Sequence, residues 1–317
     1  LALRVGVADV AHAARGGAPV DDGLAESTQA GAIDRGIPDL LCHEGGHRPG
    51  QVGTLSGEQE DPAVRLGHRC VSLLASARGG ERYETYLAYD ERRLALVAVK
   101  VVRPDLTTDA VARRGLAREA ELLVRLSHPA IVRSFGAVLD GPRPYLLLEH
   151  LEGPRLSSLV RRHGPLDLEQ LAPLGVQLAS AAHYMAAEGV VHLDIKPSNV
   201  IMGAPARLID LSIARTADLL PGRVRPIGTD AYMAPEQCDP VGRGPLTPAA
   251  DVWGLGATLH HAALGRATFA AATDRQDEAA PAPAPPAARF PQLVRPPEPL
   301  PSRLPRALAE VVTRCLA

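Results

Sequence analysis

The sequence lacks the features that would place it in several broad classes of protein. It has no uninterrupted apolar stretch of about 18 residues, so no membrane-spanning helix is encoded. Its formal net charge is only −2, which gives no reason to expect nucleic acid or an anionic membrane as a partner. Four cysteines occur without paired spacing, and this favours a reducing cytoplasmic location over a disulfide framework. Aromatic residues make up just 3% of the chain.

What is present indicates a globular protein with an unstructured beginning. Of the 317 residues, 46% are hydrophobic, enough for a sizeable core in one or two domains. Residues 1–69 show no sustained periodicity and many Gly, Ala, Asp and Pro residues, so we expect a disordered extension there. Residues 281–305 hold ten prolines, which predicts an extended connector.

Periodicity locates the individual elements and predicts an α+β fold. Threonine followed by proline at 247–248 is a favourable helix start, because threonine can cap the helix and proline suits its first position. A further helix is expected around Glu119, after the first strands. Strands are predicted at 71–74, 83–88, 94–101 and on through Val138 and Leu146, and long helices at 168–188 and 248–264.

The most informative segment is residues 191–201, Val-His-Leu-Asp-Ile-Lys-Pro-Ser-Asn-Val-Ile, together with residues 208–212. These segments place Asp194, Lys196 and Asn199 close in sequence, with Asp210 shortly after. Phosphoryl transfer from ATP needs a carboxylate to orient and accept from a hydroxyl, a cation on the γ-phosphate and oxygen ligands for Mg²⁺. The two segments contain all of these groups.

A lysine and a glutamate upstream fit the same chemistry. Lys100 ends a buried strand, Val-Ala-Val-Lys, which is typical of the lysine that holds ATP's α- and β-phosphates. Glu119 begins a segment that reads as an amphipathic helix, closed by His128 and Pro129. Helical spacing puts the leucines of this segment on the core side and selects Glu119, rather than Glu121, as the partner of Lys100.

Taken in order, these motifs resemble those of bacterial, eukaryotic-type serine/threonine protein kinases. Residues 145–153 resemble the last strand and hinge of the small lobe, with Leu148 as gatekeeper. Residues 228–236 resemble the end of the activation segment, and residues 251–256 the start of the buried central helix. The resemblance implies the two-lobed protein kinase fold over residues 70–317, with a β-rich lobe at 70–150 and a larger helical lobe at 151–317.

The resemblance also implies roles for individual residues. Asp194 and Lys196 would be catalytic, and Asn199 and Asp210 would hold Mg²⁺ or Mn²⁺. Lys196 and Thr229 resemble serine/threonine rather than tyrosine kinases, so the expected substrates are serine and threonine hydroxyls of proteins. The oligomeric state stays open. ATP would be bound by Lys100, Glu119, Gly79, Gly80, Ala98, Glu149, Leu151 and Ile201.

The loop that covers the phosphates departs from the family pattern Gly-x-Gly-x-x-Gly. Only Gly80 falls on a motif glycine, while Arg78 and Tyr83 replace the outer two. Side chains at these positions would hinder a close approach of the backbone to the phosphates, although Gly79 offers a shifted turn.

Two further departures concern control of activity. Leu193 precedes the catalytic aspartate where an arginine could pair with a phosphorylated activation loop, and no Ser or Thr lies between Thr216 and Thr229. We therefore predict that activation-loop phosphorylation is not the switch. Ser212 replaces the glycine of the metal-binding loop and restricts its backbone.

Two alternative functions share part of this pattern. A pseudokinase acting as a nucleotide-binding or scaffold module would explain the eroded glycine loop and Ser212, but not the presence of every charged group that the reaction needs. A small-molecule phosphotransferase would not explain Ala-Pro-Glu at 234–236 or the Gly-Thr-x-x-Tyr segment.

Two other features lie near the ends of the chain. His-Glu-Gly-Gly-His at 43–47 matches a zinc-protease pattern, but its glycines and flanking prolines argue for a chance match. Residues 304–317 resemble the penultimate helix of the large lobe, so we expect the last helix, and an arginine partner for Glu236, to be missing.

Overall fold

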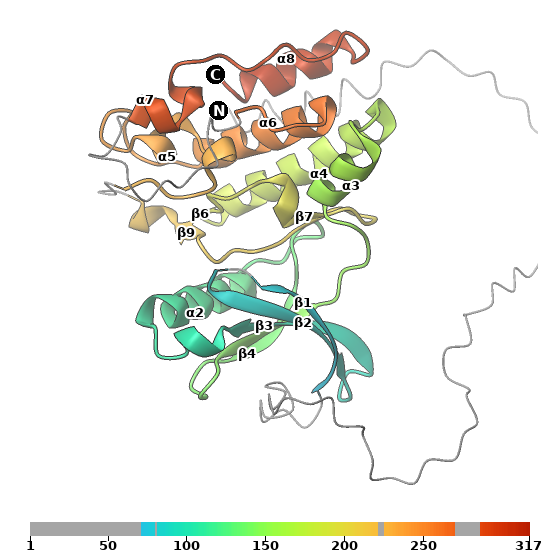
Figure 1. Ribbon diagram of the computed structural model, residues 1–317, viewed down its shortest axis with the longest axis vertical. Helices are drawn as coiled ribbons and strands as arrows, with labels where there is room; N and C mark the ends of the chain where they lie inside the picture. The colour runs from blue at the N-terminus through green and yellow to red at the C-terminus, as the bar shows by residue number, and fades with distance from the viewer. Residues whose placement is uncertain (1–70, 80, 221–224, 270–285) are drawn as a thin grey trace, which may run out of the picture. The chain divides into compact units, whose positions relative to one another are not determined.

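The computed structural model describes residues 71–79, 81–220, 225–269 and 286–317. The predicted extension at 1–69, the histidines at 43 and 47, and Gly80 lie outside these ranges. A five-stranded antiparallel sheet in the order β1-β2-β3-β5-β4 forms the first part of the fold (Figure 1). Its strands are β1 (Val71–Gly79), β2 (Tyr83–Asp90), β3 (Ala95–Val102), β4 (Ser134–Val138) and β5 (Tyr145–Glu149).

One long helix, α2 (Ala110–Arg125), accompanies the sheet (Figure 1). It begins well before Glu119, the start of the segment that the sequence pattern marked, because Asp109 caps it by accepting a hydrogen bond from the Ala112 amide at 2.6 Å. Its buried side includes Leu116, Glu119 and Leu122. The helix therefore turns one carboxylate toward the sheet along with its leucines.

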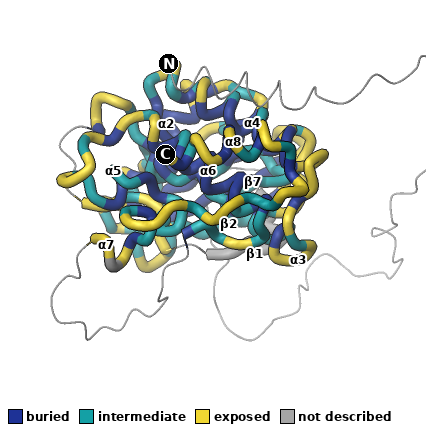
Figure 2. The backbone as a smooth tube through the Cα atoms, turned by 90° about the horizontal axis from the view of Figure 1, so that it is seen from above, coloured by how far each residue is buried: buried dark blue, intermediate teal, exposed yellow. Residues whose placement is uncertain are grey.

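The second part of the fold is helical and follows β5. Within it, α6 is buried almost all round and lies beside α4 and α8 (Figure 2). A helix that is apolar on nearly every side belongs at the centre of a lobe. The helices are α3 (Leu156–His163), α4 (Leu168–Ala187), α5 (Pro235–Cys238), α6 (Ala249–Leu264), α7 (Pro286–Arg289) and α8 (Arg306–Arg314).

Two small two-stranded sheets frame the residues between α4 and α5. Strand β6 (Val190–Val191) pairs with β9 (Arg215–Thr216), and β7 (Val200–Ile201) pairs with β8 (Arg207–Leu208). The loop at 192–199 is thereby fixed at both ends. The 3₁₀ helices are η1 (Pro104–Leu106), η2 (Pro197–Asn199), η3 (Ala217–Leu219), η4 (Asp230–Tyr232) and η5 (Pro291–Leu293).

The predicted elements agree with this architecture apart from their ends. The helix predicted from 248 begins at Ala249, whose amide donates to the Thr247 hydroxyl at 3.3 Å. The part of the proline-rich connector that the structure describes is not extended throughout, because it contains α7 and η5. No helix in the described ranges is long and apolar enough to cross a membrane.

Candidate active site

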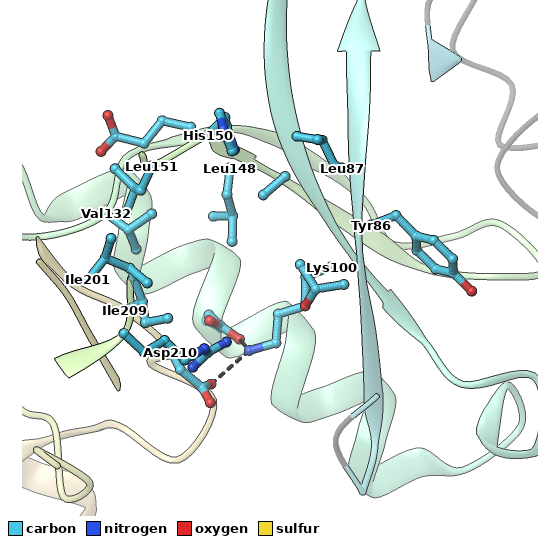
Figure 3. A pocket seen from close by; sticks show the side chains of 15 residues that line it. Tyr86, Leu87, Lys100, Val132, Leu148, His150, Leu151, Ile201, Ile209 and Asp210 are labelled. Atoms are coloured by element: carbon cyan, nitrogen blue, oxygen red, sulfur yellow. Dashed lines mark hydrogen bonds and ion pairs between the residues drawn. The ribbon is translucent and has the colours of Figure 1, made fainter. Parts of the chain in front are cut away.

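A pocket of about 370 Å³ opens between the sheet and the helical lobe (Figure 3). One end is apolar and is bounded by the segment after β5, where Leu151 lies close to Leu148. The other end carries Lys100 and Asp210, which face each other. An apolar cavity with a few converging charges is the usual form of a cofactor site. The apolar lining comes from Leu87, Ala98, Val132, Leu148, Leu151, Ile201 and Ile209.

The charged end is organised by Lys100, whose side chain is only 8% exposed. Its ammonium lies 2.6 Å from Glu119 Oε2 and 2.8 Å from Asp210 Oδ1. The second oxygen of Glu119 accepts from the Leu211 amide at 3.1 Å, so helix α2 is tied to the loop that carries Asp210. The structure thus brings together the lysine and glutamate that helical spacing paired.

The pKa values of this triad reflect burial and mutual attraction. Burial alone would lower the pKa of Lys100, but the carboxylates of Asp210 and Glu119 raise it above its usual value. Burial would raise the pKa of Asp210, and the Lys100 ammonium instead lowers it far below its usual range. Complete burial raises the pKa of Glu119 despite the lysine. Lys100 is therefore a permanent cation at this end of the pocket.

A second cluster surrounds Asp194, in the loop between β6 and η2. Its Oδ1 accepts from the Thr229 hydroxyl at 2.7 Å, and its Oδ2 lies 2.7 Å from the Lys196 ammonium. Lys196 also donates to the Thr229 hydroxyl at 2.6 Å. The Asn199 amide nitrogen donates to Asp194 Oδ2 at 3.0 Å. These contacts fix one carboxylate, one cation and one hydroxyl in mutual hydrogen-bond range.

The backbone that presents Asp194 is strained and held from two sides. Leu193 has φ +67°, a left-handed conformation that costs a non-glycine residue about 1–3 kcal/mol. The buried Asp251 of α6 accepts from the Leu193 amide at 2.8 Å. The buried Gln237 of α5 donates to the Leu193 carbonyl at 2.8 Å. Both backbone groups of this residue are thus held in place by side chains of the large lobe.

A backbone hydrogen bond brings Asn199 and Asp210, the predicted metal ligands, close together. The Ile209 amide donates to the Asn199 carbonyl at 2.9 Å, directly before Asp210. Because the Asn199 amide nitrogen is committed to Asp194, its amide oxygen is the atom suited to a cation. Two hard oxygen donors fit Mg²⁺, which binds through one or two protein ligands together with water and phosphate. The described residues accordingly hold no group of three or more His, Cys, Asp or Glu that could bind a metal alone.

The predicted residues fall into two neighbouring groups. Lys100, Glu119, Ala98, Glu149, Leu151, Ile201 and Asp210 line the pocket, while Asp194, Lys196 and Asn199 form the adjacent loop cluster. Gly79 is the last residue of β1, and Gly80 lies outside the described ranges. The Glu149 carboxylate does not face the pocket's charged end, because it accepts from the Arg133 amide at 2.7 Å.

Several supporting residues were missed from the sequence. Asp251 and Gln237 hold the loop backbone, and Val132 and Ile209 line the pocket. Asp251 left a signal in the sequence, since it is the one acidic residue of α6, a helix composed mainly of apolar residues. Gln237 left no such signal, because no sequence pattern predicts which backbone groups a glutamine next to the Ala-Pro-Glu motif will bind.

A comparison with protein families decides the identity of this arrangement. The model of the protein kinase domain matches residues 79–317. The chain belongs to this family. The two-lobed kinase fold, predicted from the motifs, is confirmed, and protein kinases as a family use ATP together with a divalent metal.

Known relatives and a solved structure agree with this assignment. Serine/threonine-protein kinase PkaA of Streptomyces coelicolor is 40% identical over 181 residues, which cover 55% of this chain and 33% of PkaA. Serine/threonine-protein kinase PknB of Mycobacterium leprae is 32% identical over 200 residues, 60% of this chain and 32% of PknB. The chain therefore spans about a third of these relatives' length.

The structural likeness concerns the fold alone. The crystal structure of the PF14_0431 kinase domain matches with a TM-score of 0.55 and 20% identity, over 63% of this chain and 66% of that one.

Proposed function

We propose that this kinase domain transfers the γ-phosphoryl group of ATP to serine and threonine hydroxyls of proteins. The observation that carries the proposal is the cluster of Asp194, Lys196 and Thr229 beside a pocket whose lysine is paired with Glu119 and Asp210. Positioning and charge stabilisation supply most of the catalysis of phosphoryl transfer, and both require groups that are already in place.

Each residue then has a defined task. Asp194 orients the acceptor hydroxyl and accepts its proton, while Lys196, 2.7 Å away, steadies the charge on the transferred group. Lys100 holds the α- and β-phosphates and is kept in position by Glu119. Asn199 and Asp210 would hold Mg²⁺ or Mn²⁺, which supplies charge neutralisation on the phosphates when bound. The backbone from Glu149 to Leu151 would contact the adenine.

The contact between Lys196 and Thr229 supports the assignment of serine and threonine side chains as the acceptors. Thr229 bridges the catalytic loop and the end of the activation segment through its two hydrogen bonds. A scaffold without activity would have no need of this bridge. The scattered cysteines favour a cytoplasmic location, which we include in the proposal.

The test combines nucleotide binding with transfer. ATP should raise the melting temperature of the purified protein, more strongly with Mg²⁺ or Mn²⁺ than with a chelator. Radiolabelled ATP should give metal-dependent labelling of the protein itself or of an added protein, in serine and threonine only.

Asp194→Asn should lower transfer about 10²- to 10⁴-fold and leave ATP binding nearly unchanged, because the carboxylate acts on the acceptor rather than on the nucleotide. The matched control is Asp140→Asn, which alters an exposed aspartate in the turn between β4 and β5. Wild-type protein that binds ATP but transfers nothing with either metal would favour the scaffold function instead.

A further inference from the structure

Tyr83, which replaces the last glycine of the phosphate loop, connects the sheet with helix α2. Its hydroxyl donates to the Ala112 carbonyl at 2.8 Å. The Lys100 ammonium lies over its ring, 4.8 Å from the ring centroid and within the range of a cation–π contact. Burial raises the pKa of the Tyr83 hydroxyl, so this group remains a hydrogen-bond donor at neutral pH. The side chain thus contacts the lysine and the helix at once.

Helix α2 has a notch that admits the phenol. Gly115 lies one turn after Ala112, in the interior of the helix, where glycine is unfavourable compared with alanine. A Cβ atom at this position would clash with the Tyr83 oxygen, whereas it would lie 3.7 Å from the nearest ring carbon and 3.9 Å from the Ser212 carbonyl oxygen. Only the contact with the hydroxyl oxygen is too close, so the glycine makes room for this one atom.

The contact made at Ala112 is transmitted to Glu119. Seven residues separate the two, which is close to two full turns, so they lie on the same side of the helix. Holding Ala112 toward β2 therefore also holds Glu119 toward Lys100, 2.6 Å away. Lys100 is contacted by Glu119, Asp210 and the Tyr83 ring.

We propose that Tyr83 is a positioning residue that keeps helix α2 and Lys100 in the arrangement needed to bind the nucleotide. The tyrosine that replaces the motif glycine then has a structural role, because its side chain helps to position α2. The effect on transfer rests on the function proposed above, whereas the contact itself can be measured without turnover.

The experiment is a double-variant cycle. Tyr83→Phe removes the hydroxyl and keeps the ring, and Gly115→Ala forces the hydroxyl away from Ala112. The combined variant carries both changes. Tyr89→Phe is the control, since Tyr89 is a partly exposed tyrosine on the same strand and outside the nucleotide pocket. Each protein is measured for melting temperature, for the Kd of MgATP by calorimetry, and for KM and kcat in transfer.

Tyr83→Phe and Gly115→Ala should each raise the Kd and KM for ATP about 2- to 10-fold, the range for loss of one hydrogen bond, with a smaller change in kcat. The combined variant should bind no more weakly than Tyr83→Phe alone, because both changes remove the same contact. Without the hydroxyl, Gly115→Ala should raise the melting temperature through helix propensity, whereas in the wild-type background it should not.

Additive losses in the combined variant, or ATP binding by Tyr83→Phe equal to wild type, would overturn the proposal. If wild-type protein binds ATP without transferring phosphate, the non-additive cycle in Kd and melting temperature would still support the role of Tyr83, and only the proposed function would fail. If transfer occurs and the cycle is additive, the function stands and Tyr83 has no positioning role.

Discussion

Removal of Lys100 should cost stability as well as activity, because it leaves Glu119 in the core without its partner. The Glu119 side chain is fully buried, and the distance to the lysine is 2.6 Å. After Lys100→Met the carboxylate must take up a proton or stay charged, and among the described residues only the Leu211 amide still donates to it. Breaking a buried pair in this way costs about 3–5 kcal/mol. For a domain of this size that corresponds to a melting temperature lower by about 6–20 °C.

A second substitution separates the two effects. Glu119→Gln in the Lys100→Met background removes the charge but keeps an oxygen to accept from the Leu211 amide. The introduced amide nitrogen can also donate to Asp210, which has lost the same lysine. The combined variant should therefore recover most of the lost melting temperature while remaining inactive, since no cation is left for the phosphates.

The assay is thermal unfolding of the three proteins without nucleotide, paired with ATP binding. Arg306→Met is the matched control, because Arg306 and Glu310 are also 2.6 Å apart but lie on the surface. Exposed ion pairs contribute little to stability, so this variant should have the same melting temperature as the wild type. A Lys100→Met protein with the melting temperature of the wild type, or a combined variant as unstable as Lys100→Met, would show that the lysine does not compensate the buried Glu119 carboxylate.

Three further results are expected. Phosphatase-treated and untreated protein should phosphorylate an added substrate at similar initial rates, because Leu193 offers no cation to a phosphorylated loop; a large loss traced to a site in the activation segment would contradict this. Gln237→Leu should destabilise the protein by several kcal/mol, at about 1–3 kcal/mol for each buried group left unpaired, because Gln237 hydrogen-bonds the Leu193 and Ile227 carbonyls and the Ala234 amide. The control is Gln170→Leu at an exposed position, and equal melting temperatures of the two variants would refute this prediction. Burial lowers the pKa of His260 below 6.5, so the unfolded chain binds more protons than the folded one near and below that pH. The melting temperature should therefore fall as the pH drops from about 7.5 to about 5.5, and His260→Asn should reduce that fall. An unchanged dependence of melting temperature on pH in this variant would count against the prediction.

The local chemistry of the site could be predicted from the sequence because short motifs encode it. The loop with Asp194, Lys196 and Asn199 spans six residues, and the contacts of Asp194 with Lys196 and Asn199 lie within that span. The pairing of Lys100 with Glu119 was also predictable, since the leucines of the helix fix which side of it faces the core.

The supporting contacts could not be predicted, since they join residues far apart in sequence. Tyr83 and Ala112 are 29 positions apart, and nothing in the sequence pattern pairs a tyrosine with a helix carbonyl. The early start of α2 was missed because its first turns mix arginines with alanines and carry little apolar periodicity, so the cap at Asp109 decides the boundary. Leu193 was recognised as a departure from the family, but its burial came only from the structure.

The position of Leu193 has a consequence for how such an enzyme could be turned off. Its side chain belongs to a buried apolar cluster that also contains Leu220 of the activation segment and Trp253 of α6. A contact between a phosphate and an arginine weakens with ionic strength and can be erased by hydrolysis, whereas an apolar contact has no charge for salt to screen and no phosphate to lose. Concentrated salt and cellular phosphatases would leave this arrangement intact. The cluster that holds Leu193 would then persist without a reversible mark on the loop.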